Sequence, residues 1–122
     1  MKLVLRVARL AGVFAESGGS LLLETGQETA ETLVAFLDEM GKRGAENVGV
    51  NFDPANMIMY GSGEALAALR RVGAYLKSCH CKDAAWSDEP GVAWGLETPL
   101  GEGDVGIRDF IATLNDLGYT GP

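Results

Sequence analysis

Three short apolar runs, each ending in polar residues that can bind a metal ion, alternate with amphipathic segments. The runs are SLLLE at 20–24, NVGVNFD at 47–53 and LKSCHCKD at 76–83. Their length and apolar character are typical of strands that are buried on both faces of a parallel sheet. Because strands that alternate with helices form such sheets, the sequence predicts an α/β fold.

The segments around these runs have the spacing of helices. Apolar residues at helical intervals predict four helices, over 3–16, from 29 to either Gly41 or Gly44, over 62–76 and over 105–118. Thr29 is interpreted as the N-cap of the second helix, with Thr25 as the alternative, and Ser62 as the N-cap of the third. For the first segment a strand over 3–7 stays open, because KLVLRV partly alternates. A long loop is expected over 84–104.

The composition excludes several classes of partner. A chain of 122 residues is enough for one small domain. The net charge of −7 argues against nucleic acid and anionic membranes, because both are bound by basic patches. No apolar run is long enough to cross a membrane. Lys2, Arg6 and Arg9 interrupt the apolar N-terminus, where a signal peptide would need an unbroken run, so we expect a cytoplasmic protein.

Both cysteines and the single histidine lie in the stretch SCHCKD, which raises the possibility of a zinc cluster. Side chains alternate along a strand, so His80 should face the same side as Lys82, whereas Cys79 and Cys81 face the other side. We therefore expect the cysteines to be buried under the outer helices as small apolar residues. Thiols at this spacing do not easily form a disulfide, which also favours a reducing, cytoplasmic setting.

Glu24, Asp53 and His80 each lie at or near the end of a predicted strand, at intervals of about 30 residues, which is one βα repeat. In βα barrels the carboxyl ends of the strands meet at one mouth, where active sites lie. Two carboxylates and one imidazole suit a divalent cation. Each residue alone could be a helix cap or a structural histidine, but their recurrence at three strand ends favours a metal site.

The motifs around these residues resemble those of a known family. LLLETGQETAETL, VGVNFDPANM, HCKD and PLGEGDVGIRDFIATLNDLGYTGP are similar, in order and spacing, to motifs of the sugar phosphate isomerase/epimerase family, which are xylose-isomerase-like TIM barrels. The resemblance covers nearly the whole chain. A full barrel has eight strands and about 250 residues, so it implies a partial (β/α)8 barrel, a single domain over 1–122, with about three parallel strands and four helices.

The resemblance implies one divalent metal ion (Mn, Zn, Co or Mg), bound by Glu24, Asp53, His80 and a fourth glutamate that has no counterpart before Pro122. Glu24 would be both ligand and catalytic acid/base, and it would move a proton of a sugar or polyol through a metal-stabilised enediolate. Without the fourth glutamate and the front of the barrel, we expect little or no turnover. The open sheet edges should make the chain associate with itself or with a complementing barrel half.

Further residues are predicted to bind the substrate. Gln27 and Glu28 follow Glu24 where relatives contact the sugar, although Glu28 could instead stabilise its helix. Asn56 is expected to bind substrate or to orient a loop, with a simple turn residue as the alternative. Lys82 could bind an anionic or hydroxylated substrate, because it faces the same side as His80.

Supporting roles are predicted for residues beyond the third strand. Asp83 is expected to fix a nearby side chain of the site. Glu102 lies in the GEGD signature, and it is expected with Asp104 to build the loop and to cap the last helix. Trp86 and Trp94 could stack on a sugar or pack locally.

Several functions compete. The resemblance favours a metal-dependent sugar, sugar phosphate or polyol isomerase or epimerase. A non-catalytic assembly module with a residual metal site is the main alternative, because the fourth ligand is missing. An inosose-type dehydratase on the same barrel is also open. An apurinic-site endonuclease is disfavoured, because it needs a cluster rich in histidine and a basic face, whereas this chain has one histidine and a charge of −7.

Overall fold

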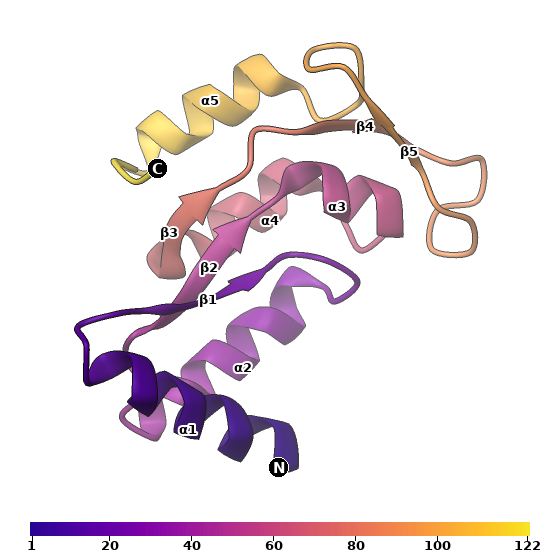
Figure 1. The fold of residues 1–122 in the computed structure, drawn as a ribbon. Helices are drawn as coiled ribbons and strands as arrows, with labels where there is room; N and C mark the ends of the chain where they lie inside the picture. The colour runs from indigo at the N-terminus through magenta and orange to yellow at the C-terminus, as the bar shows by residue number, and fades with distance from the viewer.

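The computed structural model describes all residues, 1–122, and is built on a sheet of three parallel strands (Figure 1). The strands β1 (Leu21–Glu24), β2 (Val48–Phe52) and β3 (Leu76–Cys79) lie in the order β1-β2-β3. The helices are α1 (Lys2–Ala15), α2 (Ala30–Lys42), α3 (Pro54–Tyr60), α4 (Ala65–Val72) and α5 (Ile107–Asp116), and a 3-10 turn, η1 (Gly73–Tyr75), leads into β3. The expected α/β fold with three parallel strands is confirmed, with five helices instead of four.

The extra helix is α3, and its origin lies in Pro54. The sequence predicts that Pro54 ends the second strand, and it does, but it also starts a helix, because proline is favoured in the first helical turn. Ser62 does not cap the next helix as predicted: its hydroxyl donates to the carbonyl of Gly26 at 2.8 Å, and α4 starts only at Ala65. Thr29 does cap α2, because its hydroxyl accepts a hydrogen bond from a first-turn amide.

The hydrophobic core lies between the sheet and the helices. The central strand supplies Val48, Val50 and Phe52, all buried. The Phe52 ring stacks on Phe110 of α5, with ring centroids 6.1 Å apart. α1 is helical over Lys2–Ala15, close to the predicted range of 3–16, so the alternative of a strand over 3–7 is wrong. No helix in the structure combines the length and the apolar character needed to cross a lipid bilayer.

The pairing of β2 with β3 contains a register shift. Val50 lies opposite Leu76, whereas the next residue, Asn51, lies opposite Ser78, so β3 has one extra residue at this point. Such a bulge changes which side chains of a strand face which side of the sheet. The amide of His80 then donates to the last carbonyl of β2 at 2.8 Å, which continues the pairing just beyond β3.

The segment after β3 contains a hairpin as well as the expected loop. β4 (Asp83–Ala85) and β5 (Leu96–Thr98) pair antiparallel, beside α3 in Figure 1. Asp104 does not cap α5, which follows Gly106 in a left-handed conformation. The carboxylate of Asp104 accepts a hydrogen bond from the Trp86 amide at 2.9 Å instead.

Candidate metal centre

Glu24, Asp53 and His80 lie together at the carboxyl ends of the three parallel strands. One possible ligand atom of each lies within 4.8 Å of those of the other two. The Nδ1 atom of His80 lies 2.7 Å from Oε1 of Glu24 and 3.4 Å from Oδ2 of Asp53. The parallel arrangement therefore brings together the three residues that the sequence predicts as ligands.

Asp53 forms the buried floor of this cluster. Its side chain is 1% exposed, whereas those of Glu24 and His80 are 45% and 51% exposed. Oδ1 accepts a hydrogen bond from the Asn56 amide at 3.1 Å and so caps α3. Oδ2 is buried and makes no hydrogen bond, although His80 and Lys82 each lie 3.4 Å away as charge partners. This oxygen has no hydrogen bond to lose, and it lies close to one ligand atom each of Glu24 and His80. Two carboxylates and an imidazole in this arrangement fit a divalent cation.

Thr25 fixes the distance between the ends of β1 and β2. This buried residue accepts a hydrogen bond at Oγ1 from the Asp53 amide at 2.8 Å, and its hydroxyl donates to the Asp53 carbonyl at 2.9 Å. Because Thr25 directly follows Glu24, the two bonds hold both carboxylates in place. The sequence suggested only a helix-capping role for Thr25, and no local motif indicates a partner so far along the chain.

Lys82 lies between the cluster and the hairpin. Its Nζ atom is 3.4 Å from Oδ2 of Asp53 and 3.1 Å from Oε2 of Glu97. Burial lowers the pKa of Lys82, but its hydrogen bond to Glu97 and the charge of Asp53 outweigh this effect and raise the pKa. Lys82 therefore stays a cation beside the cluster. Glu97, on β5, is not among the site residues predicted from the sequence.

An open pocket of about 360 Å³ adjoins Glu24. Its lining residues are Glu24, Thr25, Gly26, Gln27, Glu28, Asn56 and Tyr60. Three of the four predicted substrate-binding residues thus share one pocket with a predicted ligand. The side-chain amide of Asn56 donates to the Thr25 carbonyl at 3.1 Å, so it also holds the loop that forms the pocket wall.

Asp83 is predicted to fix a nearby side chain of the site, but it binds backbone amides instead. It is buried, and its two oxygens accept hydrogen bonds of 2.9–3.1 Å from the amides of Ala84, Gly101, Gly103 and Val105. Burial alone would raise the pKa of Asp83, but these four bonds outweigh it and lower the pKa below its usual value. Glu102 is exposed on the loop that Asp83 holds.

Neither cysteine belongs to the cluster, and they are not both buried. Cys79 is half-buried against the core, whereas Cys81 is exposed. The prediction of burial is wrong for Cys81, because β3 ends at Cys79 and the alternation of the strand ends with it. Trp86 packs against the core, and Trp94 is exposed and meets the Tyr60 ring edge-on with centroids 5.3 Å apart.

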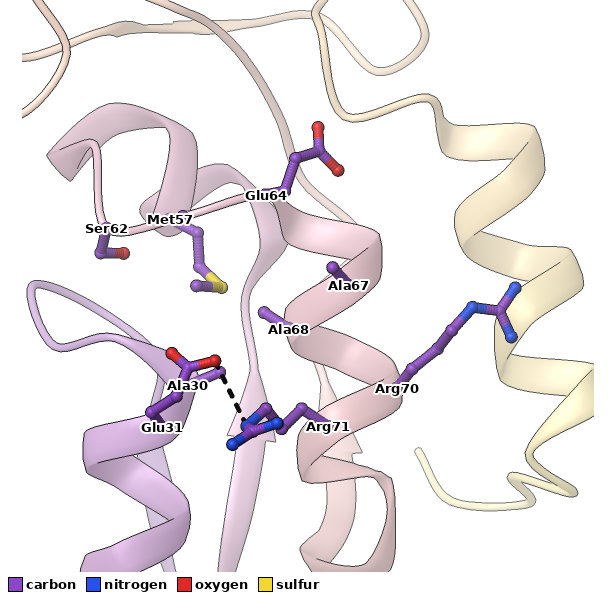
Figure 2. A pocket seen from close by; sticks show the side chains of 10 residues that line it. Ala30, Glu31, Met57, Ser62, Glu64, Ala67, Ala68, Arg70 and Arg71 are labelled. Atoms are coloured by element: carbon purple, nitrogen blue, oxygen red, sulfur yellow. Dashed lines mark ion pairs between the residues drawn. The ribbon is translucent and has the colours of Figure 1, made fainter.

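A larger pocket, of about 490 Å³, lies between α2 and α4. Figure 2 shows that Arg71 and Glu31 face one another there, as an ion pair of 3.3 Å, whereas Arg70 points towards α5. Arg70 donates to the Thr113 hydroxyl at 3.2 Å. Because Arg71 and Glu31 pair with each other and no cluster of metal ligands lines it, this pocket is not the candidate site.

Comparison with known proteins identifies relatives of the chain. A family model described as xylose isomerase-like TIM barrel matches residues 2–122. A xylose isomerase domain protein from Planctomyces limnophilus shares 46% identity over 99% of this chain, with a TM-score of 0.94. A xylose isomerase-like TIM barrel protein from Mycobacterium smegmatis, solved in complex with magnesium, shares 27% identity over 98% of this chain, with a TM-score of 0.79. The chain spans 44% and 40% of the lengths of these two proteins.

More distant structures share the fold alone. The probable 3-DHS dehydratase AsbF from Bacillus anthracis is 18% identical over 95% of this chain and 46% of its own length, with a TM-score of 0.73. A D-tagatose 3-epimerase-like protein is 18% identical over 97% of this chain and 44% of its own length, with a TM-score of 0.72. None of the curated proteins compared with the chain matches it significantly. The observed fold is therefore part of a TIM barrel.

Proposed function

Because the chain belongs to the xylose isomerase-like TIM barrel family, we propose that its cluster of Glu24, Asp53 and His80 is the divalent-cation site of a sugar or polyol isomerase or epimerase. The observation that carries this proposal is Oδ2 of Asp53, a buried carboxylate oxygen without a hydrogen bond, directed at two other ligand atoms. Such an oxygen is what a cation would compensate.

The residues that would hold the cation are Glu24 through Oε1, Asp53 through Oδ2 and His80 through Nδ1. Carboxylate and imidazole ligands suit Mn, Co or Zn, and carboxylates also suit Mg. The magnesium of the Mycobacterium smegmatis protein supports a hard cation of this kind. When bound, such a cation polarises substrate oxygens and stabilises negative charge on them.

Glu24 is the candidate acid/base of this site. Its carboxylate is 45% exposed and lines the open pocket, so it can reach a substrate, unlike the buried Asp53. A carboxylate there can accept a proton from the carbon next to a substrate carbonyl and return it. Lys82 is placed to bind a substrate oxygen, while Thr25 holds the carboxylates in position.

Cation binding is tested by titrating Mn²⁺ into the chain in a calorimeter. We expect Asp53→Asn to weaken binding by about 100-fold or more, because it removes the charge of the buried ligand. The matched control, Asp88→Asn, changes an exposed acid and should bind like the unaltered chain. Equal Mn²⁺ affinity for the Asp53→Asn variant and the control would contradict the site.

Proton transfer is tested separately, with a panel of ketoses in heavy water. Exchange of the hydrogen next to the carbonyl, seen by NMR and lost in Glu24→Gln, would support an isomerase or epimerase. Elimination of water instead would assign a dehydratase. Because the chain spans less than half of its relatives, the assay should be run with and without a complementing barrel half.

A second candidate is an assembly module with a cation site and no turnover. The open sheet favours it, because β1 and β3 each have only one neighbouring strand and keep one unpaired edge. This function predicts a dimer, or a complex with a complementing half. Light scattering during gel filtration tests it, and a monomer under all conditions would contradict it.

A further inference from the structure

Glu97, on the hairpin β4–β5, is connected to the cluster of Glu24, Asp53 and His80 through Lys82. Oε2 of Glu97 lies 3.1 Å from Nζ of Lys82, and the same Nζ lies 3.4 Å from Oδ2 of Asp53. Lys82 therefore has two acidic partners, one in the cluster and one on the hairpin. The side chain of Lys82 is 34% exposed and that of Glu97 is 57% exposed, so the pair is at the rim of the site and Asp53 is at its floor.

The backbone of Glu97 is held in place independently of the cluster. Glu97 lies opposite Ala84 in the hairpin, and Asp83, next to Ala84, binds four backbone amides. Gly103 packs so closely that a Cβ there would lie 2.3 Å from Oδ1 of Asp83 and 2.6 Å from Oγ1 of Thr98. The hairpin can thus present Glu97 at a constant position whether or not the cluster holds an ion.

The geometry creates a competition at Oδ2 of Asp53. A divalent cation and the ammonium group of Lys82 would both occupy the surroundings of this one buried oxygen, and two like charges at such a distance repel each other. The ammonium group of Lys82 must therefore move when a cation binds. If it moved into solution, the favourable charge interaction with Asp53 would be lost and not replaced. Glu97 is already within reach of Nζ and offers that partner.

We propose that Glu97 is a positioning residue that takes over the ammonium group of Lys82 when a cation binds Asp53. This inference rests on the proposed cation site. It makes the hairpin part of that site, and it keeps Lys82 at the rim, where its ammonium can bind a substrate oxygen, instead of leaving it in competition with the cation.

The test is a double-mutant cycle on Mn²⁺ affinity, measured by calorimetry with Mn²⁺ alone. We expect Glu97→Gln to weaken binding about fivefold, because Lys82 then keeps its hold on Asp53. Lys82→Met should bind Mn²⁺ more tightly than the unaltered chain, because the competitor is gone. In the Lys82→Met background, Glu97→Gln should change affinity by about twofold or less, since only a screened surface charge is lost.

Two further variants sharpen this cycle. Glu97→Asp keeps the charge and should recover part of the affinity that Glu97→Gln loses. Glu102→Gln removes an exposed acid from the loop after β5 and should have no effect. Circular dichroism in EDTA should show the same fold for all variants.

Distinct outcomes separate the possible failures. An equal effect of Glu97→Gln in both backgrounds would overturn the proposal, because Glu97 would then act only as a surface charge. If Glu97→Gln does not fold, Lys82→Met still decides, because unchanged or weaker Mn²⁺ binding by that variant also overturns it. Absence of Mn²⁺ binding by the unaltered chain would overturn the proposed function itself, and this inference with it.

Discussion

Asp53 and Asp83 are equally buried, at 1% exposure each, but they have opposite surroundings. Both oxygens of Asp83 accept hydrogen bonds from backbone amides, four in all. Asp53 has one hydrogen-bonded oxygen and one that has none. The carboxylate of Asp83 is thus fully bonded within the fold, whereas Oδ2 of Asp53 has only the charges of His80 and Lys82 beside it.

Burial alone therefore does not distinguish an acid that is fully bonded within the fold from one whose oxygen can still bind a cation. The satisfied acid at Asp83 organises the loop and the hairpin, and the unsatisfied one at Asp53 lies among residues that can bind metal. A buried carboxylate oxygen that lacks hydrogen bonds and has only charge partners is the feature on which the proposed cation site rests.

The largest expected effect comes from making the same change at both aspartates. Asp83→Asn should lower the free energy of unfolding by about 3 kcal/mol, because the NH₂ group of the new amide would face backbone N–H donors and cannot accept hydrogen bonds from them. Asp53→Asn should change it by less than about 1 kcal/mol in EDTA, because an amide oxygen can still cap α3. Urea unfolding measures both values. Equal losses would remove the distinction between the two aspartates.

A smaller loss is expected from crowding the satisfied aspartate. Gly103→Ala would place a Cβ 2.3 Å from Oδ1 of Asp83 and 2.7 Å from the Ala84 carbonyl. We expect a loss of about 2 kcal/mol in urea unfolding, because the loop must shift. Gly41→Ala is the control, since a Cβ at Gly41 meets nothing within 4 Å. Full stability of Gly103→Ala would mean that the loop does not need its close packing.

A substitution of Thr25, which holds Asp53, should lower the free energy of unfolding less than Gly103→Ala does, but it should weaken Mn²⁺ binding. Thr25→Val keeps the shape but removes the hydroxyl that bonds to the Asp53 backbone twice. We expect a loss of about 1 kcal/mol and about tenfold weaker Mn²⁺ binding, as for residues that orient ligands. Thr120→Val, at an exposed threonine, is the control. Unchanged Mn²⁺ affinity in Thr25→Val would mean that Thr25 does not position the ligands.

The smallest effect should come from pH. The folded chain lowers the pKa of Asp83 below its ordinary 3.8, through hydrogen bonds that outweigh burial. The stability that Asp83 contributes is therefore fully present above that ordinary value and is lost as the pH falls through the lower folded value. Urea unfolding between about pH 5 and about pH 3 should show this loss, and Asp83→Asn should flatten it. If Asp83→Asn showed the same pH dependence of stability as the unaltered chain, Asp83 would not be the group responsible for it.

Much of the fold could be predicted, because strand and helix periodicity are local signals. The ends of the strands placed Glu24, Asp53 and His80 correctly at one edge of the sheet. The helix α3 was not predictable in the same way, since Pro54 signals both the end of a strand and the start of a helix. The cytoplasmic location and the association with other chains stay predictions.

The supporting residues were harder to find, because their roles depend on partners far along the chain. Thr25 bonds to Asp53, and Lys82 to Glu97, only once the chain has folded. The role of Asp83 also depends on a loop that follows the hairpin. Local motifs indicate which residue types could do chemistry, but tertiary contacts decide which of them are free to do it.

The extra residue in β3 determines which side chain of this strand lies in the cluster. Without it, the pairing of Val50 with Leu76 would continue residue by residue and place Cys79, not His80, beside Asp53. The cluster would then offer a soft thiolate where it now offers an imidazole, and thiolates select zinc or copper(I) over magnesium or manganese. A single inserted residue in one strand thus determines which metal ions the proposed site would prefer.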